Sequence, residues 1–229
     1  MKQAPFRGLR AGLALLVAIA MLGMASANDE LVTLQGDPTQ FVMPNANYAA
    51  TNFSPLDRIN RHNVQNLEVK WTFQTGVLDS TEAQPLVVGT TMYVMTPKPN
   101  TIIALDLARD GVIKWAFEPE MDTERAGALA CCGAQSRGLA YADGNLFFAT
   151  LDGQLYSISA EDASVNWSTQ AADLDIGETT PGNPYLVNDT IIIGNEGGER
   201  GVRGWVGAWD IEKYKIDGSS LHPLVYTDV

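Results

Sequence analysis

The adjacent residues Cys131 and Cys132 are the only two cysteines of this 229-residue chain. Neighbouring Cα atoms lie about 3.8 Å apart, below the roughly 4.4 to 6.8 Å usual for a disulfide, so a bond between them would close a strained ring. Such a ring would make a small, rigid, apolar platform. The spacing leaves two alternatives open, namely two free thiols pointing opposite ways along a strand and a bridge between chains. Arg137 follows five residues after the pair, at the entrance to an apolar segment.

Two other kinds of site are excluded by the pattern around their residues. The run Gly197-Gly198-Glu199 is rich in glycine, but neither the Lys-Ser/Thr pair nor the strand-to-helix context of a phosphate-binding loop follows it. His62 and His222 have no partner at a spacing typical of metal ligands. We therefore interpret both histidines as surface residues.

The elements that must position the cysteines form an internal repeat that starts at Leu67. Three stretches, residues 85–115, 139–167 and 185–210, share one order of short apolar strands and turns. The first two end in tryptophan, and with Trp71 the closing tryptophan recurs at positions 71, 115 and 167. These intervals match a four-stranded propeller blade with loop insertions.

The second strand of each repeat is the clearest single element. Residues 92–95, 146–150 and 190–194 are apolar or β-branched runs of strand length bounded by Gly, Asn and Asp. The sequence therefore predicts an all-β fold, a partial β-propeller of about three four-stranded blades. Because closed propellers have about four to eight blades, these are too few to complete a ring alone.

The first 27 residues have the pattern of a cleavable secretory signal peptide. A basic start leads into apolar residues 11–24, and Ala25-Ser26-Ala27 precedes a polar segment. The alternative is a membrane anchor, but the apolar stretch is shorter than the roughly 20 residues that a spanning helix needs. We expect cleavage after Ala27, export to the periplasm and no membrane span.

The rest of the chain divides into three segments. Residues 28–66 are predicted to form an irregular lead-in with a short helix around residues 55–60, and residues 67–210 the propeller blades. Residues 211–229 lose the repeat and read as a divergent or truncated tail. The formal net charge of −12 argues against nucleic acid and anionic lipid as partners.

Three ordered motifs resemble the quinoprotein alcohol dehydrogenases of the methanol and ethanol dehydrogenase type. They are Cys-Cys-x4-Arg-Gly-Leu-Ala-Tyr at 131–141, Glu-Ala-Gln-Pro-Leu-Val-Val at 82–88 and Gly-Asn-Glu-Gly-Gly-Glu-Arg-Gly-Val-Arg-Gly at 194–204. The lead-in at 48–63 is similar too, and the resemblance covers roughly residues 40 to 210. It implies an eight-bladed propeller with pyrroloquinoline quinone (PQQ) near the axis, over a bound Ca²⁺ or lanthanide ion.

The resemblance also implies roles for individual residues on the cofactor. Cys131 and Cys132 would form a ring disulfide that stacks on the quinone. Arg137 would hydrogen-bond the quinone oxygens, where a fixed cation stabilises developing negative charge. Glu82 would contact the cofactor rim.

Further roles fall on the third motif. Gly197 and Gly198 would let the backbone approach the cofactor closely, and Glu199 would ligate the metal as a hard carboxylate for a hard ion. The family usually has Ser or Gly where Glu196 stands, which we interpret as a solvated loop residue. It usually has Thr where Pro181 aligns, so that Thr180 would substitute.

The activity implied by the resemblance is oxidation of a small primary alcohol, with electrons leaving to a cytochrome c and with a homodimer as a possible assembly. The catalytic Asp and the remaining metal ligands are expected beyond this chain, so we expect it to be inactive alone. The alternative function is a noncatalytic exported propeller that acts as a scaffold or binding module. The cysteine pair, Arg137 and Glu199 distinguish the two, because a scaffold has no use for them in this order.

Overall fold

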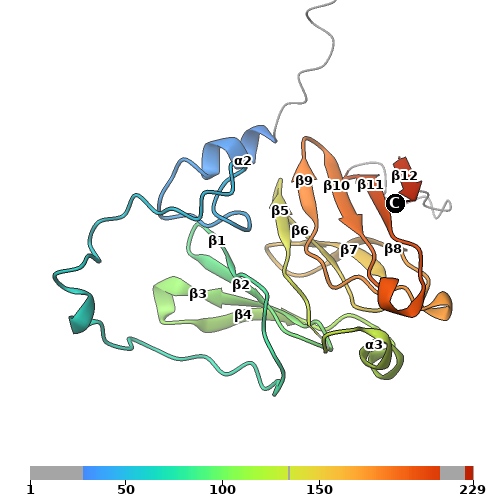
Figure 1. Ribbon diagram of the computed structural model, residues 1–229. Coiled ribbons are helices and arrows are strands. Elements are labelled where there is room, and N and C mark those ends of the chain that lie inside the picture. Colours follow the sequence, from blue (N-terminus) through green and yellow to red (C-terminus); the bar gives the residue numbers. More distant parts are fainter. Residues whose placement is uncertain (1–27, 134, 212–224, 229) are drawn as a thin grey trace, which may run out of the picture.

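Three four-stranded antiparallel sheets form the framework of the computed structural model, which describes residues 28–133, 135–211 and 225–228. Strands that follow one another in the chain are neighbours in each sheet, and the sheets stand side by side as successive blades (Figure 1). The prediction of an all-β fold with about three blades is confirmed. The predicted signal peptide, residues 1–27, lies outside the described residues.

The strands of each sheet are short. The first sheet contains β1 (Leu86–Val88), β2 (Thr91–Met95), β3 (Ile102–Asp106) and β4 (Val112–Phe117). The second contains β5 (Ala140–Ala142), β6 (Asn145–Ala149), β7 (Gln154–Ser159) and β8 (Val165–Gln170). The third contains β9 (Tyr185–Val187), β10 (Thr190–Gly194), β11 (Trp205–Asp210) and β12 (Val225–Asp228). The strands predicted at 92–95, 146–150 and 190–194 correspond to β2, β6 and β10.

The hairpin between β5 and β6 illustrates how local sequence sets these meanders. Its two turn residues, Asp143 and Gly144, have φ angles of 49° and 74°. A two-residue hairpin loop with positive φ at both positions matches the twist of the flanking strands, and Asp-Gly is a favoured pair there. The turn therefore fixes the register that pairs Ala142 with Asn145.

Adjacent blades are joined through an aromatic side chain at the end of the first sheet. Trp115 on β4 donates from Nε1 to the carbonyl of Ala160 at 3.3 Å, and the Tyr93 hydroxyl donates to the same carbonyl at 3.1 Å. The tryptophan thus docks on the second sheet, as a blade-closing residue should. One hydrophobic core continues through all three sheets and includes the fully buried Leu86, Phe148 and Trp209.

The start of the predicted repeat, around Trp71, differs from the later copies. Residues 67–84 form no strand in the structure, and the first sheet begins at Leu86. The Trp71 ring instead covers Gly111, where an added Cβ would lie 2.7 Å from a ring carbon. A strand needs a hydrogen-bonded neighbour, and no described segment pairs with residues 67–84.

The lead-in contains a helix at its start rather than around residues 55–60, so that prediction is wrong as well. Helix α2 (Asp29–Leu34) is capped by Asn28, whose Oδ1 accepts from the Leu31 amide at 3.0 Å. Glu30 accepts from the Tyr141 hydroxyl at 3.2 Å, which anchors α2 to β5. At 55–60 the Asn60 amide donates to the Asn63 side chain instead, and such local bonds compete with helix formation.

The remaining short elements were not predicted. They are helix α3 (Thr123–Leu129) and the 3-10 helices η1 (Val64–Asn66), η2 (Leu107–Arg109), η3 (Leu174–Ile176) and η4 (Gly198–Arg200). The end of the predicted tail pairs with β11 as β12, so it completes the third sheet rather than diverging from it. None of the helices in the described part of the chain is long and apolar enough to cross a membrane.

Candidate functional site

The cysteine pair directly follows helix α3, which holds it in place. The helix starts after Asp122, whose Oδ1 accepts from the Arg125 amide at 3.1 Å. Ala126 and Ala130 are buried in a small core together with Leu151 of the second sheet's connecting loop. Capping and this packing fix the direction in which the chain leaves the helix at the cysteines.

Arg200 connects α3 to the loop that carries Gly197, Gly198 and Glu199. Its Nε donates to the carbonyl of Leu129 at 2.7 Å, and its Nη2 donates to the carbonyl of Ala128 at 2.7 Å. These are carbonyls of the last helical turn, which have no partner within the helix. The guanidinium therefore brings two motifs about 70 residues apart against one another.

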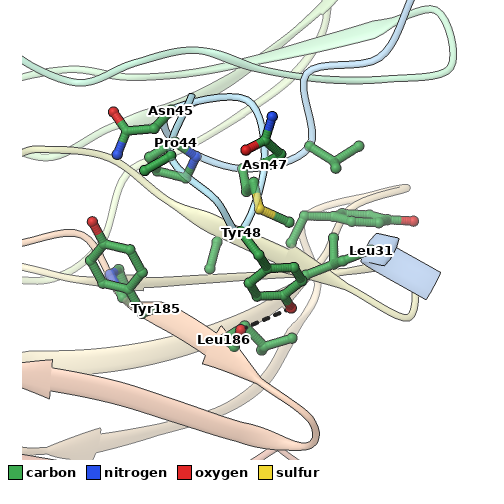
Figure 2. Close-up of a pocket in the computed structure, with 13 residues that line it drawn as sticks. Leu31, Pro44, Asn45, Asn47, Tyr48, Tyr185 and Leu186 are labelled. Carbon is green, nitrogen blue, oxygen red and sulfur yellow. Dashed lines mark hydrogen bonds between the residues drawn. The ribbon is translucent and has the colours of Figure 1, made fainter. Parts of the chain in front are cut away.

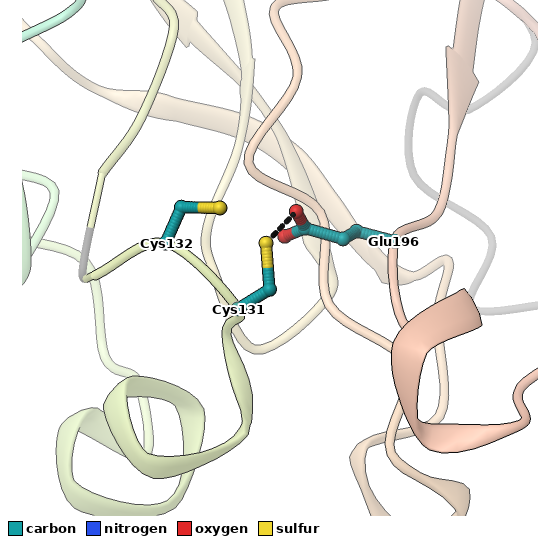
Figure 3. Close-up of side chains that lie close together, drawn as sticks. All are labelled: Cys131, Cys132 and Glu196. Atoms are coloured by element: carbon teal, nitrogen blue, oxygen red, sulfur yellow. Dashed lines mark hydrogen bonds between the residues drawn. The ribbon is translucent and has the colours of Figure 1, made fainter.

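Both cysteines are exposed free thiols, so the predicted ring disulfide is absent from the structure. The Cys131 thiol instead donates to Oε1 of Glu196 at 2.9 Å (Figure 3). Its hydrogen bond with Cys132, and then that with Glu196, raise the pKa of Cys131 to about 12. Ring strain and a competing carboxylate acceptor both favour the thiol form.

Glu196 is held by a neighbouring segment rather than being the solvated loop residue that we predicted. Its amide donates to the carbonyl of Thr179 at 2.7 Å, and the Thr179 amide donates back to the Glu196 carbonyl at 3.1 Å. The Thr179 hydroxyl also donates to Oε2 of Glu196 at 3.4 Å. This pairing fixes where the carboxylate can lie.

Arg137 joins two further motifs. Its amide donates to the carbonyl of Pro181 at 2.8 Å, and its Nε lies 3.4 Å from Oε2 of Glu82. Both side chains of this ion pair are 43% exposed. A guanidinium has five donors, so one such contact leaves most of its hydrogen-bonding capacity available to a ligand.

The two adjacent glycines differ in their surroundings. Gly197 is buried at a φ of +136°, and an added Cβ would lie 2.8 Å from the carbonyl oxygen of Gly177 and 2.9 Å from Cβ of Val202. Packing within the chain therefore requires glycine at this position. Gly198 is exposed, and nothing lies within 4 Å of an added Cβ. Only Gly198 faces open space that a ligand could fill.

These contacts join the motifs into one continuous site. Glu82 meets Arg137, and Arg137 meets the 179–181 segment, which pairs with Glu196. Glu196 in turn meets Cys131, and Arg200 closes the arrangement on α3. The sequence motifs that are far apart along the chain are brought together by the ends of the three sheets.

Comparison with known proteins identifies the fold family. Residues 43–213 match the family model of the PQQ-dependent glucose/ethanol/alcohol dehydrogenase β-propeller domain. The chain belongs to this family. It is 48% identical to the lanthanide-dependent methanol dehydrogenase of Methylacidiphilum fumariolicum strain SolV over 194 residues, which are 84% of this chain and 32% of that protein.

Other relatives in the PQQ alcohol dehydrogenase family agree with this assignment. Methanol dehydrogenase [cytochrome c] subunit 1 of Paracoccus denitrificans is 40% identical over 202 residues, 86% of this chain and 32% of that protein. The solved structure of a europium-containing methanol dehydrogenase superposes with a TM-score of 0.82 at 44% identity, over 88% of this chain and 34% of the other. The chain thus spans about a third of the length of the relatives it matches.

The residues of the site fit a planar anionic quinone with a hard cation. The Arg137 guanidinium is exposed, and Gly198 leaves space for close approach. Glu199 is 42% exposed and has only a loose contact of 4.0 Å with Arg200, so its carboxylate is open to a metal ion. These donors match the chemical character of PQQ and of Ca²⁺ or a lanthanide ion.

Thr180 is the exception among the predicted cofactor contacts. It is 1% exposed, and its hydroxyl donates to the carbonyl of Thr150 at 2.5 Å while its amide donates to that of Leu151 at 3.3 Å. The hydroxyl is therefore not available to a ligand. Thr180 fastens the 179–181 segment to the second sheet, and we omit it from the proposed cofactor contacts.

The sequence reasoning missed a buried carboxylate beneath the site. Glu178 is 6% exposed and accepts hydrogen bonds from Nε1 of Trp205 at 3.0 Å and from the amide of Asp173 at 2.8 Å. It thereby braces the segment that holds Glu196. A lone Glu in a turn carries no pattern from which this role could have been predicted.

A small cavity of about 100 Å³ lies away from the site, between the lead-in and the inner strands β5 and β9 (Figure 2). Its lining is mostly apolar and includes Leu31, Tyr48 and Leu186. The Tyr48 hydroxyl donates to the carbonyl of Leu186 at 3.0 Å. Three tyrosines line it as well, Tyr48, Tyr141 and Tyr185, but no carboxylate, histidine, lysine, arginine or cysteine is among its lining residues.

Proposed function

We propose that the protein containing this chain oxidises a small primary alcohol with PQQ and a bound Ca²⁺ or lanthanide ion, and passes the electrons to a cytochrome c. The observation that carries this proposal is the convergence of Cys131, Arg137 and the Gly198–Glu199 loop on one site, through contacts made by both side chains and backbone. Relatives named as lanthanide-dependent and cytochrome c methanol dehydrogenases support the choice of substrate, metal and acceptor.

Each residue has a distinct task in this proposal. Arg137 donates hydrogen bonds to the cofactor oxygens, and Glu82 orients the guanidinium from behind. Cys131 and Cys132 would hold the cofactor, and Glu199 would ligate the metal ion. When bound, PQQ supplies the two-electron acceptor that no amino-acid side chain provides.

We place the protein in the periplasm, on the basis of the signal-like pattern of residues 1–27. An oxidising compartment would let the two cysteines interconvert between thiols and a disulfide. A homodimer is the assembly that we propose for the whole protein. The alternative function, a noncatalytic scaffold, would bind no PQQ.

The test is dye-linked oxidation of primary alcohols by the purified protein that contains this chain, loaded with PQQ and either Ca²⁺ or La³⁺. We expect Arg137→Ala to weaken PQQ binding by about tenfold to a hundredfold, because charge-assisted hydrogen bonds contribute about 1.5–3 kcal/mol. Arg109→Ala is the matched control, since Arg109 pairs with Asp106 on a surface turn. If the protein neither binds PQQ nor oxidises alcohols under both metals, the scaffold function holds instead.

A further inference from the structure

We propose that Cys131, Cys132 and Glu196 form a binding site for a thiophilic divalent ion such as Zn²⁺ when both cysteines are reduced. The one Oε and two Sγ ligand atoms all lie within 4.8 Å of one another (Figure 3). This site differs in donor chemistry from the hard-metal position at Glu199. It does not depend on alcohol oxidation, and it concerns the chain in its thiol form.

The observed separations lie on either side of those in a formed site: Cys131 Sγ and Glu196 Oε1 are 2.9 Å apart, and the three ligand atoms lie within 4.8 Å of one another. In tetrahedral zinc sites, ligand bonds of about 2.0 to 2.3 Å place two ligand atoms about 3.3 to 3.8 Å apart. The Cys131 thiol already lies 2.9 Å from Oε1 of Glu196, so an ion would insert into this contact. Both cysteine side chains are exposed and can rotate about χ1 to complete the geometry.

The donor set selects the class of ion. Two thiolates suit zinc, cadmium and similar borderline or soft ions, whereas Ca²⁺ and lanthanides take oxygen ligands. Binding displaces one proton from each thiol, so two cysteine thiols and one Zn²⁺ give a dithiolate complex and two protons. With three ligands from the chain, the fourth position is left to water at this exposed place.

Rigid supports hold the three ligands near one another before any ion binds. Arg200 ties the helix before Cys131 to the Gly197–Glu199 loop, and the paired backbones of Thr179 and Glu196 fix the carboxylate. Little ordering is therefore needed on binding, which favours affinity.

Zinc at this site would compete with loading of the cofactor. A disulfide between the cysteines removes both thiolates, so the ion and the disulfide exclude one another. Zinc bound here would occupy the face that we propose for PQQ. We therefore expect zinc to lower PQQ binding by the reduced protein and to leave the oxidised protein unaffected.

The experiment titrates the reduced, chelator-treated 229-residue chain with Cd²⁺ under anaerobic conditions, and then with Zn²⁺ against a chromogenic chelator. We expect one ion per chain and a thiolate-to-cadmium charge-transfer band, both lost after alkylation of the cysteines. Glu196→Gln should weaken zinc affinity at least about tenfold, since even outer-shell partners are worth about 10- to 100-fold. Glu161→Gln, in the exposed turn that follows β7, is the matched control and should leave zinc affinity unchanged.

Three results would overturn the inference. They are zinc affinity that is equal in Glu196→Gln and the unsubstituted chain, binding that survives alkylation, and an ion shared between two chains in a zinc-dependent dimer. PQQ binding by the oxidised protein is measured separately. Its loss would reject the proposed function and leave the zinc site standing, whereas loss of zinc binding alone would reject only the zinc site.

Discussion

The adjacent glycines 197 and 198 offer a direct test of which backbone approaches the cofactor. Gly197→Ala would place a methyl group 2.8 Å from the Gly177 carbonyl oxygen at a φ of +136°. A residue forced into such a region costs about 1–3 kcal/mol, and overpacking costs a similar amount. We expect Gly197→Ala to lower the free energy of unfolding by at least about 2 kcal/mol.

Gly198→Ala should behave in the opposite way. Its added methyl group meets nothing within 4 Å, and no positive φ opposes the substitution. The free energy of unfolding should stay within about 1 kcal/mol, with a small gain from the reduced entropy of the unfolded chain. If the open space at Gly198 receives PQQ, however, the methyl group should reduce PQQ affinity at least about fivefold, because overpacking costs about 1–3 kcal/mol.

Urea unfolding of the 229-residue chain measures the two stabilities, and fluorescence titration with PQQ measures binding by the protein that contains it. A Gly197→Ala chain as stable as the unsubstituted one would show that the steric reasoning is wrong. Unchanged PQQ affinity in Gly198→Ala would show that the cofactor does not approach this backbone. The pair thus separates a structural glycine from a functional one.

Three further predictions concern support, ionisation and binding. Glu178→Ala removes the acceptor that lies 3.0 Å from Trp205 Nε1. Because a hydrogen bond to a charged group contributes about 1.5–3 kcal/mol, the free energy of unfolding measured in urea should fall by that amount, and a fall of less than about 0.5 kcal/mol would contradict this. Burial, and then the charge of Glu30, raise the pKa of Tyr141 to about 12. The phenol's contribution to the free energy of unfolding is fully present below pH 10 and is lost as the pH rises toward 12, because the unfolded chain ionises first. Tyr141→Phe should therefore reduce the fall in the free energy of unfolding between about pH 10 and 12, measured by urea unfolding. An unchanged pH dependence would refute this prediction. Arg137→Lys should leave stability within about 0.5 kcal/mol because its ion pair is exposed, yet weaken PQQ binding in titrations about tenfold; equal affinity would exclude the guanidinium as a ligand.

The sequence was sufficient for elements whose signal is local. The strands β2, β6 and β10 were predicted because runs of apolar and β-branched residues between turn formers favour strands wherever they occur. The same holds for the blade repeat and for Trp115, whose position at the end of a sheet follows from the repeat. The motifs around the cysteine pair, Arg137 and Glu199 likewise identified the family before any contact was known.

Elements that depend on partners distant in sequence could not be predicted in this way. Helix α3 has only seven residues and is supported by packing against Leu151 and by Arg200 at its last turn. Such a short helix is marginal by itself, so its sequence carries little signal. The segment around Trp71 forms no strand for the reverse reason, since a strand pattern forms no strand without a neighbour to pair with, although the Trp71 ring still covers Gly111.

Within the site, residue types were determined by the sequence, whereas their partners were decided by the tertiary structure. Sequence alone established a propeller chain with two adjacent cysteines, an arginine and a glycine-rich acidic loop, because these are properties of residue order. Only the folded chain paired Cys131 with Glu196, buried the hydroxyl of Thr180 and distinguished Gly197 from Gly198. Hydrogen bonding and steric exclusion act over a few ångströms, and the packing of separate blades decides which side chains come within that range.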